Sequence, residues 1–325
     1  MRANLIVDLA QIAANWQALD ALTAVETAAV VKADAYGLGA AQVAPKLLKT
    51  GVKTFFTALA EEAVAVRKAV GPEPEIYVFS GALPGDGPLL TEHNLIPCIN
   101  APEQLTNISK NNKIALQIDS GMNRLGMEPA QIPEGLDPCL IITHLACSDD
   151  PTSPHNLEQL HVFKAVTERF SCPNSIAATG GIHLGAEFHA DLTRPGIGLY
   201  LNAARLALPV IQTRIVEVAE FVGYSAAYVA ETPRKIATVS AGYADGIPRI
   251  MSGAMLYFEG QPCPIVGRIS MDLITVDVTD LPETPQMLDL MCEKQSETDL
   301  AGLAQTIPYE ILTSLGPRYA RTYLA

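Results

Sequence analysis

Short apolar segments alternate with helical patterns over the first two thirds of the chain, and this alternation restricts the possible folds most. The eight segments are rich in Val, Ile and Phe and lie at 28–31, 54–58, 76–80, 95–99, 114–118, 140–144, 175–179 and 196–200. The helical patterns lie at 9–22, 41–49, 60–70, 101–110 and 155–170. Strands that alternate with helices predict a parallel sheet. Eight such units over roughly 200 residues favour a (β/α)8 TIM barrel, with a doubly wound sheet as the alternative.

After about residue 208 the pattern changes to strand-like segments separated by Pro and Gly. Residues 273–278, "LITVDV", alternate apolar and polar side chains as a half-buried strand does. Helical patterns return only at 298–305 and 309–315. The sequence therefore predicts an α/β barrel at residues 1–208, followed by a mostly β domain at residues 209–325.

The composition narrows the possible partners. The net charge is −13 and no run of basic residues is present, which argues against nucleic acid and against an anionic membrane surface. No apolar run reaches the ~18 residues of a membrane span, and the N-terminus lacks the features of a signal peptide. The six cysteines form no C-x-x-C pair. We therefore expect a cytoplasmic protein with free thiols, no membrane partner and no nucleic-acid partner.

Polar residues follow several of the predicted strands. Lys32 follows the first, residues 119–124 follow the fifth, and His144 ends the sixth. Thr179 ends the seventh, and residues 192–198, with Arg194 among them, lead into the eighth. A barrel places its functional groups at the C-terminal ends of its strands. These residues should therefore converge at one mouth of the barrel.

The last two predicted strands suggest a phosphate site, because barrels often bind phosphate with the loops after strands seven and eight. Thr179 offers a hydroxyl there, and Gly196 and Ile197 offer backbone N–H groups. Lys32 would face this pocket. An amine opposite phosphate donors is what pyridoxal phosphate requires, since its aldehyde needs an amine and its phosphate needs donors.

Each of these residues also has an ordinary structural explanation when it is taken alone. Lys32 fits a solvated loop, and His144 fits a hydrogen-bonded core histidine. Arg194 fits an ion pair with an acid such as Asp191. The sequence also contains "HLGAEFH" at 183–189, but this spacing is not a known metal motif, and we expect no metal.

Five longer motifs carry a resemblance to a known family. The chain resembles the alanine racemases, pyridoxal phosphate enzymes in which a barrel precedes a β domain. The resemblance runs from residue 1 to about residue 323, and the motifs occur in the family's order. They are "VVKADAYGLG", "IDSGMNRLG", "RPGIGLY", "SAGYADGIPR" and "VGRISMDLITVDVT".

This resemblance implies a set of cofactor contacts. Lys32 would hold the cofactor as a Schiff base. The phosphate would be bound by Tyr36, by Thr179 in place of the family's usual Ser, and by the backbone of Gly196 and Ile197.

The resemblance also implies the groups around the reacting carbon. Arg194 would face the pyridine nitrogen and leave it unprotonated, because a guanidinium only donates. His144 would lie beside the ring and orient Arg194 and Tyr243. Tyr243 would be the second catalytic base, supplied by the partner subunit of a homodimer. The positive charges expected to stabilise its anion belong to Arg124 and His144.

The substrate side would be lined by three residues. Arg124 would sit near the cofactor hydroxyl and the substrate carboxylate. The backbone of Met271, with Asp272 beside it, would complete this side.

Some positions depart from the family pattern. Gln117 stands where many members carry a lysine that becomes carbamylated, so we expect no carbamate and a looser Arg124. Leu38 replaces a usual histidine. Pro317 aligns where some members place a tyrosine on the phosphate, and Tyr319 is a possible substitute.

The function that the resemblance implies is racemisation of an amino acid, with alanine as the expected substrate. Three alternatives remain open from the sequence: a racemase of broader specificity, a decarboxylase of the same architecture, and a non-catalytic carrier of pyridoxal phosphate. The β domain that carries Tyr243 favours catalysis, because the carriers resemble the barrel alone.

Overall fold

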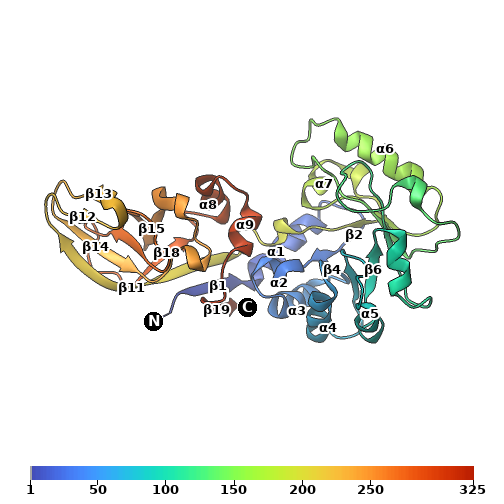
Figure 1. The fold of residues 1–325 in the computed structure, drawn as a ribbon, viewed down its shortest axis with the longest axis horizontal. Helices are drawn as coiled ribbons and strands as arrows, with labels where there is room; N and C mark the ends of the chain where they lie inside the picture. Colours follow the sequence, from blue (N-terminus) through green and yellow to red (C-terminus); the bar gives the residue numbers. More distant parts are fainter. Residues whose placement is uncertain (1) are drawn as a thin grey trace. The chain divides into compact units, whose positions relative to one another are not determined.

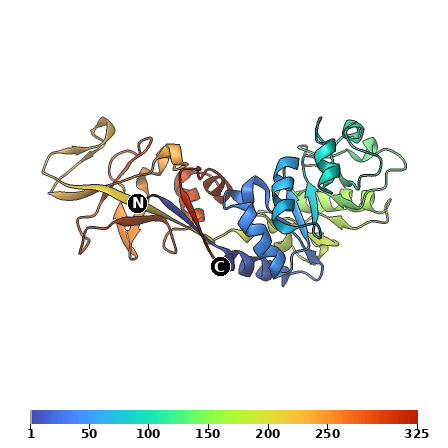
Figure 2. The same ribbon diagram turned by 90° about the horizontal axis from the view of Figure 1, so that it is seen from below.

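The structure is a computed structural model that describes residues 2–325. It contains two compact units, shown from two directions in Figures 1 and 2. One unit is formed by residues 12–199. The other is formed by residues 200–325 together with the N-terminal residues up to Gln11.

The first unit is built on short parallel strands that pair in the order of the sequence. Their side chains are almost all buried, as the apolar segments predicted, because helices cover the outer face of a parallel sheet. The strands are β3 (Ala29–Val30), β4 (Thr54–Thr57), β5 (Glu75–Val78), β6 (Ile96–Ile99), β7 (Ala115–Gln117), β8 (Leu140–Ile142) and β9 (Asn174–Ser175).

A further pair of short strands closes the barrel. β10 (Leu192–Thr193) pairs in parallel with β2 (Glu26–Thr27), which immediately precedes β3. On its other side, the N–H of Arg194 donates to the carbonyl of Ala177 just after β9 (2.8 Å). The first and last strands are thus joined, and the predicted TIM barrel is confirmed.

The predicted position of the eighth strand is wrong. Residues 197–199 form a 3-10 turn, η4 (Ile197–Leu199), and the strand is β10, a few residues earlier. The error has a physical cause, because Leu199 and Tyr200 are fully buried, and a short buried turn has the same apolar pattern as a buried strand. Arg194 and Gly196 therefore follow the last strand and lie at the barrel mouth.

Helices follow most of the barrel strands, and Figure 1 shows α3, α4 and α5 along the outer side of the sheet. The predicted helix at 101–110 is instead a 3-10 helix, η1 (Pro102–Asn107), which buries none of its residues and so lacks the apolar face that supports an α-helix. The α-helices of this part of the chain are α1 (Leu9–Asp20), α2 (Lys32–Tyr36), α3 (Ala40–Thr50), α4 (Ala60–Val70), α5 (Gly87–Glu92), α6 (His155–Thr167) and α7 (Thr179–His183).

The second unit is mostly β, as predicted. Its main sheet has the order β16 (Gln261–Pro264), β15 (Met255–Phe258), β18 (Met287–Met291), β11 (Ala204–Val216), β1 (Asn4–Asp8) and β19 (Ala320–Leu324). β14 (Arg234–Val239) pairs with β11 and with β17 (Ile274–Asp277), and β12 (Phe221–Val222) pairs with β13 (Tyr228–Val229). Two helices, α8 (Glu297–Ala304) and α9 (Pro308–Thr313), lie close to their predicted positions.

The N-terminal strand belongs to this β-rich unit, which the sequence analysis did not anticipate. β1 pairs antiparallel with β11 and parallel with β19, so the two ends of the chain share a sheet. The domain boundary after residue 208 stays a prediction, and β11 runs through it.

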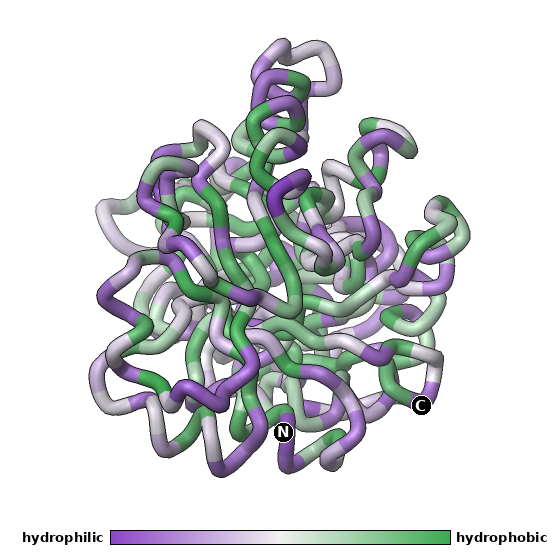
Figure 3. The backbone as a smooth tube through the Cα atoms, turned by 90° about the vertical axis from the view of Figure 1, so that its right-hand side faces the viewer, coloured by the Kyte–Doolittle hydropathy of each residue, from purple (hydrophilic) through white to green (hydrophobic). Residues whose placement is uncertain are grey.

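Figure 3 colours the backbone by hydropathy, and hydrophobic segments alternate with hydrophilic ones along the chain. All six cysteines are free thiols. Among residues 2–325, no helix combines the length and hydropathy needed to cross a bilayer.

Candidate active site

Lys32 stands where the first barrel strand ends in a strained turn. The four residues that follow, 33–36, all have φ between 52° and 56°, so they form a left-handed turn without a glycine. This conformation is unfavourable for L-residues by about 1–2 kcal/mol each and must be held by its surroundings. The Glu62 carboxylate accepts from the N–H of Ala33 (2.9 Å), and the N–H of Gly37 donates to the carbonyl of Ala33 (2.8 Å). The turn therefore fixes the backbone at Lys32.

The Lys32 amine is partly buried within this mouth. Its nitrogen lies 5.8 Å from the centre of the Phe79 ring. Burial lowers the pKa of Lys32, and the positive charges of Arg124 and Arg194 lower it further, against a raising effect from Glu62. The amine therefore becomes neutral, and able to act as a nucleophile or a base, at a lower pH than an ordinary lysine does.

Arg194 is a buried cation. Its side chain is held by oxygen atoms, with Nε donating to the hydroxyl of Ser175 (2.8 Å) and Nη2 donating to the carbonyl of Thr143 (2.5 Å). The guanidinium also lies 5.7 Å from the ring centre of Phe56 and 5.8 Å from that of Phe79. Burial lowers the pKa of Arg194 to about 10, so it remains charged at neutral pH.

No carboxylate forms an ion pair with Arg194 in the described chain, residues 2–325. The alternative of an ion pair with Asp191 is wrong, because the Asp191 carboxylate instead accepts from the backbone and side chain of Asn174. A group placed against Arg194 would therefore meet a positive charge that only donates hydrogen bonds.

Two glycines and two hydroxyls form a cradle suited to an anion. The hydroxyl oxygen of Thr179 accepts from the N–H groups of Gly196 (3.1 Å) and Gly198 (3.2 Å). A Cβ atom built on Gly196 would lie 2.2 Å from the hydroxyl of Tyr36, so only glycine allows this approach. The N–H of Ile197 has no hydrogen-bond partner within residues 2–325. Hydroxyl and N–H donors grouped in this way are typical of phosphate sites.

His144 follows β8 and lies near the positively charged groups of the mouth. Burial, followed by the charges of Arg194 and Arg124, lowers the pKa of His144 to about 3, so the ring is neutral at pH 7. In this chain His144 carries no positive charge of its own, and its role in stabilising a tyrosinate stays a prediction. Among residues 2–325, His144 forms no hydrogen bond with Arg194, whose side chain is held by Ser175 and backbone carbonyls. The orienting role of His144 stays a prediction.

Arg124 lies on the loop after β7 and is exposed. It forms no hydrogen bond or ion pair with any residue in the range 2–325. Gln117 is buried and its amide donates to the carbonyl of Leu125 (3.2 Å). Gln117 and Arg124 therefore form no hydrogen bond with each other.

In the β-rich unit, Tyr243 opens the 3-10 turn η6 (Tyr243–Asp245) and 45% of its surface is exposed. Tyr243 is therefore not a core tyrosine. The N–H of Tyr243 donates to the carbonyl of Ser270 (3.1 Å), and the N–H of Ala244 donates to that of Met271 (3.0 Å). The predicted base and the predicted substrate-side backbone thus lie on adjoining loops.

Tyr319 is not suited to replace a phosphate-binding tyrosine at Pro317. Only 4% of its surface is exposed, and its buried hydroxyl has no hydrogen-bond partner within residues 2–325. Because the ring packs into the β-rich unit, its hydroxyl is not presented at the surface of that unit.

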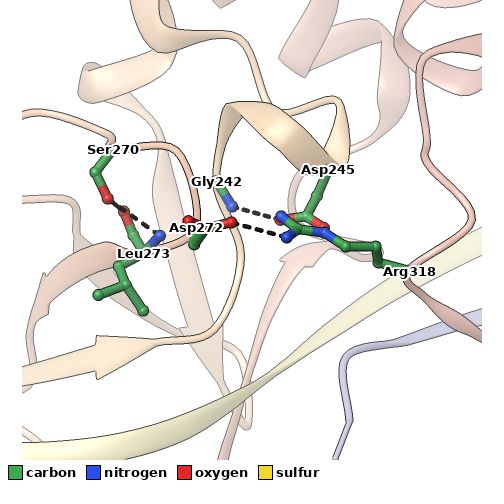
Figure 4. A network of polar contacts seen from close by, with 6 residues as sticks. All are labelled: Gly242, Asp245, Ser270, Asp272, Leu273 and Arg318. Carbon is green, nitrogen blue, oxygen red and sulfur yellow. Dashed lines mark hydrogen bonds and ion pairs between the residues drawn. The ribbon is translucent and has the colours of Figure 1, made fainter.

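Several residues that shape these sites were missed from the sequence. Ser175 and Gly198 support Arg194 and the cradle, and Asp245 and Arg318 brace the Tyr243 loop (Figure 4). Gly198 lies within the motif "RPGIGLY", and the "GIG" spacing could have identified it. The others form contacts between positions far apart in the chain, which one sequence does not reveal.

The fold and the site define a barrel protein with a reactive amine, an anion cradle and a buried arginine at one mouth. Residues 7–203 match the alanine racemase N-terminal domain, and residues 203–323 match the alanine racemase C-terminal domain. The chain therefore belongs to the alanine racemase family.

Individual relatives agree with this assignment. An alanine racemase from Cereibacter sphaeroides is 52% identical over 99% of this chain and 98% of its own length. One from Dinoroseobacter shibae is 50% identical over the same shares. The crystal structure of alanine racemase from Bartonella henselae with covalently bound pyridoxal phosphate has a TM-score of 0.92 and 35% identity, and covers 100% of both chains.

The close approach of Tyr36 to Gly196 gives a prediction about stability. Gly196→Ala should lower the free energy of unfolding by about 1–3 kcal/mol, because the new methyl group would overlap the Tyr36 hydroxyl. In a Tyr36→Phe background the same change should cost less, since the overlapping oxygen is gone. Urea unfolding of the wild type, the two single variants and the double variant measures this difference. Gly253→Ala is the control, because its added methyl would meet no atom within 4 Å. Equal costs in both backgrounds would contradict the contact.

The neutral His144 gives a prediction about acid stability. Between its ordinary pKa of 6.5 and its folded value of about 3, the unfolded chain binds a proton here that the folded chain does not. Stability should therefore fall as pH falls through this window, by up to about 1.4 kcal/mol per pH unit from this group. His144→Gln should reduce the slope of unfolding free energy against pH between 6.5 and 4. An unchanged slope would show that His144 is protonated normally in the folded protein.

Proposed function

We propose that this chain is a pyridoxal phosphate-dependent racemase that interconverts L- and D-alanine, with Lys32 and Tyr243 as its two acid–base groups. The observation that carries the proposal is the mouth of the barrel. It combines an amine of lowered pKa, a donor cradle and a buried arginine without an acidic partner. The family membership and the covalently bound cofactor of the Bartonella henselae relative support the same conclusion.

The residues present fit this cofactor. At this cradle Tyr36, Thr179, Gly196 and the neighbouring N–H of Ile197 would bind the phosphate through hydroxyl and N–H donors. Lys32 would hold the aldehyde carbon covalently, because its lowered pKa makes the amine available. When bound, the cofactor withdraws electrons from the amino acid and so acidifies the hydrogen on Cα.

Arg194 would control how strongly electrons are withdrawn. At the pyridine nitrogen it offers only N–H donors and a fixed positive charge, so it disfavours protonation of that nitrogen. A ring without that proton is the weaker electron sink. The proton would then return to Cα, which would favour racemisation over transamination.

Inversion at Cα requires proton transfer on both faces of the carbon. Lys32 would serve one face and Tyr243 the other. Arg124 would lie near the substrate carboxylate, and its charge is available because it has no ion pair among residues 2–325. The backbone of Met271, with Asp272 beside it, would line the substrate side.

We further propose that the active protein is a cytoplasmic homodimer in which the partner subunit supplies Tyr243. The exposure of the Tyr243 ring supports this arrangement, because the tyrosine is presented outward from its own unit. The D-alanine produced would serve as a precursor of peptidoglycan.

The reaction itself is the first test. Purified protein loaded with cofactor, incubated with L-alanine in deuterium oxide, should produce D-alanine with deuterium at Cα and release no carbon dioxide. Chiral chromatography with mass spectrometry measures both products. A parallel panel of L-amino acids tests whether the specificity is broader than alanine. Carbon dioxide release would indicate a decarboxylase, and the absence of both exchange and racemisation would indicate a non-catalytic carrier.

Mixing two inactive variants tests the shared site. Lys32→Ala and Tyr243→Phe should each lose nearly all activity, since each lacks one proton-transfer group. If Tyr243 comes from the partner, dissociating and mixing the two should restore up to about a quarter of wild-type activity, because hybrid dimers contain one intact site. Each variant subjected to the same treatment alone is the control. No recovery from dimers shown to be hybrid would contradict a shared site.

A further inference from the structure

We propose that Arg318 is a positioning residue for racemisation, which fixes the loop of Tyr243 against the loop of Met271. This inference rests on the proposed function, in which Tyr243 transfers a proton and Met271 lines the substrate side. Arg318 does not itself act on the substrate. It joins two carboxylates, one on each loop, as Figure 4 shows.

The contacts of Arg318 form a fork. Nε and Nη2 donate to the two oxygens of Asp245 at 2.6 Å and 2.8 Å. The remaining nitrogen, Nη1, donates to Asp272 at 2.7 Å. Paired hydrogen bonds from a planar guanidinium fix orientation as well as distance, which a single ammonium does not.

Asp245 transmits this constraint to Tyr243. Its carboxylate is only 6% exposed and also accepts from the N–H of Gly242 at 2.9 Å. Gly242 immediately precedes the η6 turn and Asp245 is its last residue, so this carboxylate ties the two ends of the turn together. A buried carboxylate needs its partners, because without Arg318 it would be left with an unpaired charge.

The two loops are in direct contact. Tyr243 and Ala244 each donate a backbone N–H to the facing loop, at the carbonyls of Ser270 and Met271. A Cβ on Gly242 would lie 2.3 Å and 2.4 Å from those same carbonyl oxygens, so glycine is required for this approach. Arg318 braces the outer side of the contact through Asp245 and Asp272. The position of Tyr243 relative to Met271 therefore depends on this arginine.

Such bracing matters because the Tyr243 ring is nearly half exposed and receives limited support from packing. The direction in which the Tyr243 ring points is therefore set by the backbone of the turn. A displacement of about 1 Å at a catalytic group can reduce the rate by about 100-fold. We therefore expect Arg318→Met to lower kcat by about 10- to 100-fold with a smaller change in KM.

The test uses the holoenzyme and measures Cα hydrogen exchange and racemisation together, for each enantiomer of alanine in deuterium oxide. If only the Tyr243 face is impaired, the enantiomer whose hydrogen faces Lys32 still exchanges but seldom inverts. Its ratio of exchange to racemisation should rise in Arg318→Met by at least several-fold, and that of the other enantiomer should not. A general loss of folded protein would lower both rates and leave the ratio unchanged.

Arg205→Met is the matched control. Arg205 also makes two hydrogen bonds to one carboxylate, Asp289, at 2.9 Å and 2.8 Å, but it does so on the main sheet. Its exchange ratio should equal that of the wild type. Arg318→Lys, which keeps the charge and loses the fork, should give an intermediate ratio. This variant also carries the test if Arg318→Met does not fold.

Tyr243→Phe distinguishes a failure of the proposed function from a failure of the proposed role of Arg318. If it leaves the ratio unchanged, the proposed role of Tyr243 is wrong. If it raises the ratio while neither folded Arg318 variant does, the proposed function stands and the positioning role of Arg318 is overturned. Raised ratios in both, with a wild-type ratio in Arg205→Met, support the role.

Discussion

The barrel mouth depends on one unusual arrangement, a buried guanidinium without a counter-ion. Burying a charge is costly unless it is well solvated by the protein. Arg194 obtains that solvation from the hydroxyl of Ser175, the carbonyl of Thr143 and two aromatic rings. These groups come from the ends of several different strands, so only a closed barrel brings them around one side chain.

The chemistry of the neighbouring groups follows in part from this charge. Burial and nearby cations, Arg194 among them, lower the pKa of both Lys32 and His144. Burial is the largest cause of both shifts and the cations add to it, so the amine is easier to deprotonate and the histidine is neutral. The β-rich unit contains the opposite arrangement, an arginine with acidic partners, since Arg318 pairs with two carboxylates to hold a loop.

The sequence predicted the fold because buried parallel strands leave a clear apolar signal. The seven barrel strands β3 to β9 overlap segments predicted from the sequence pattern. The eighth was misplaced because the buried turn after β10 has the same apolar pattern. The left-handed turn at 33–36 could not be predicted, since it contains no glycine and is held in part by Glu62, distant in the chain.

The sequence indicated which residues to consider for the candidate site, but it indicated fewer of the contacts between them. Lys32, Thr179, Arg194 and Gly196 could be named as candidates because residues at strand ends meet at one mouth, and their roles stay predictions. The pKa of His144 depends on burial and on charges from other strands. Its position in the sequence indicated neither the burial nor those charges. The Arg318–Asp245 pair spans 73 residues, and nothing local marks it.

The central claim is that Arg194 leaves the pyridine nitrogen of the bound cofactor unprotonated. The most direct measurement is the 15N chemical shift of that nitrogen in protein loaded with 15N-labelled pyridoxal phosphate. The account predicts the shift of a neutral pyridine that accepts a hydrogen bond, unchanged across neutral pH. The shift of a protonated pyridinium would contradict it.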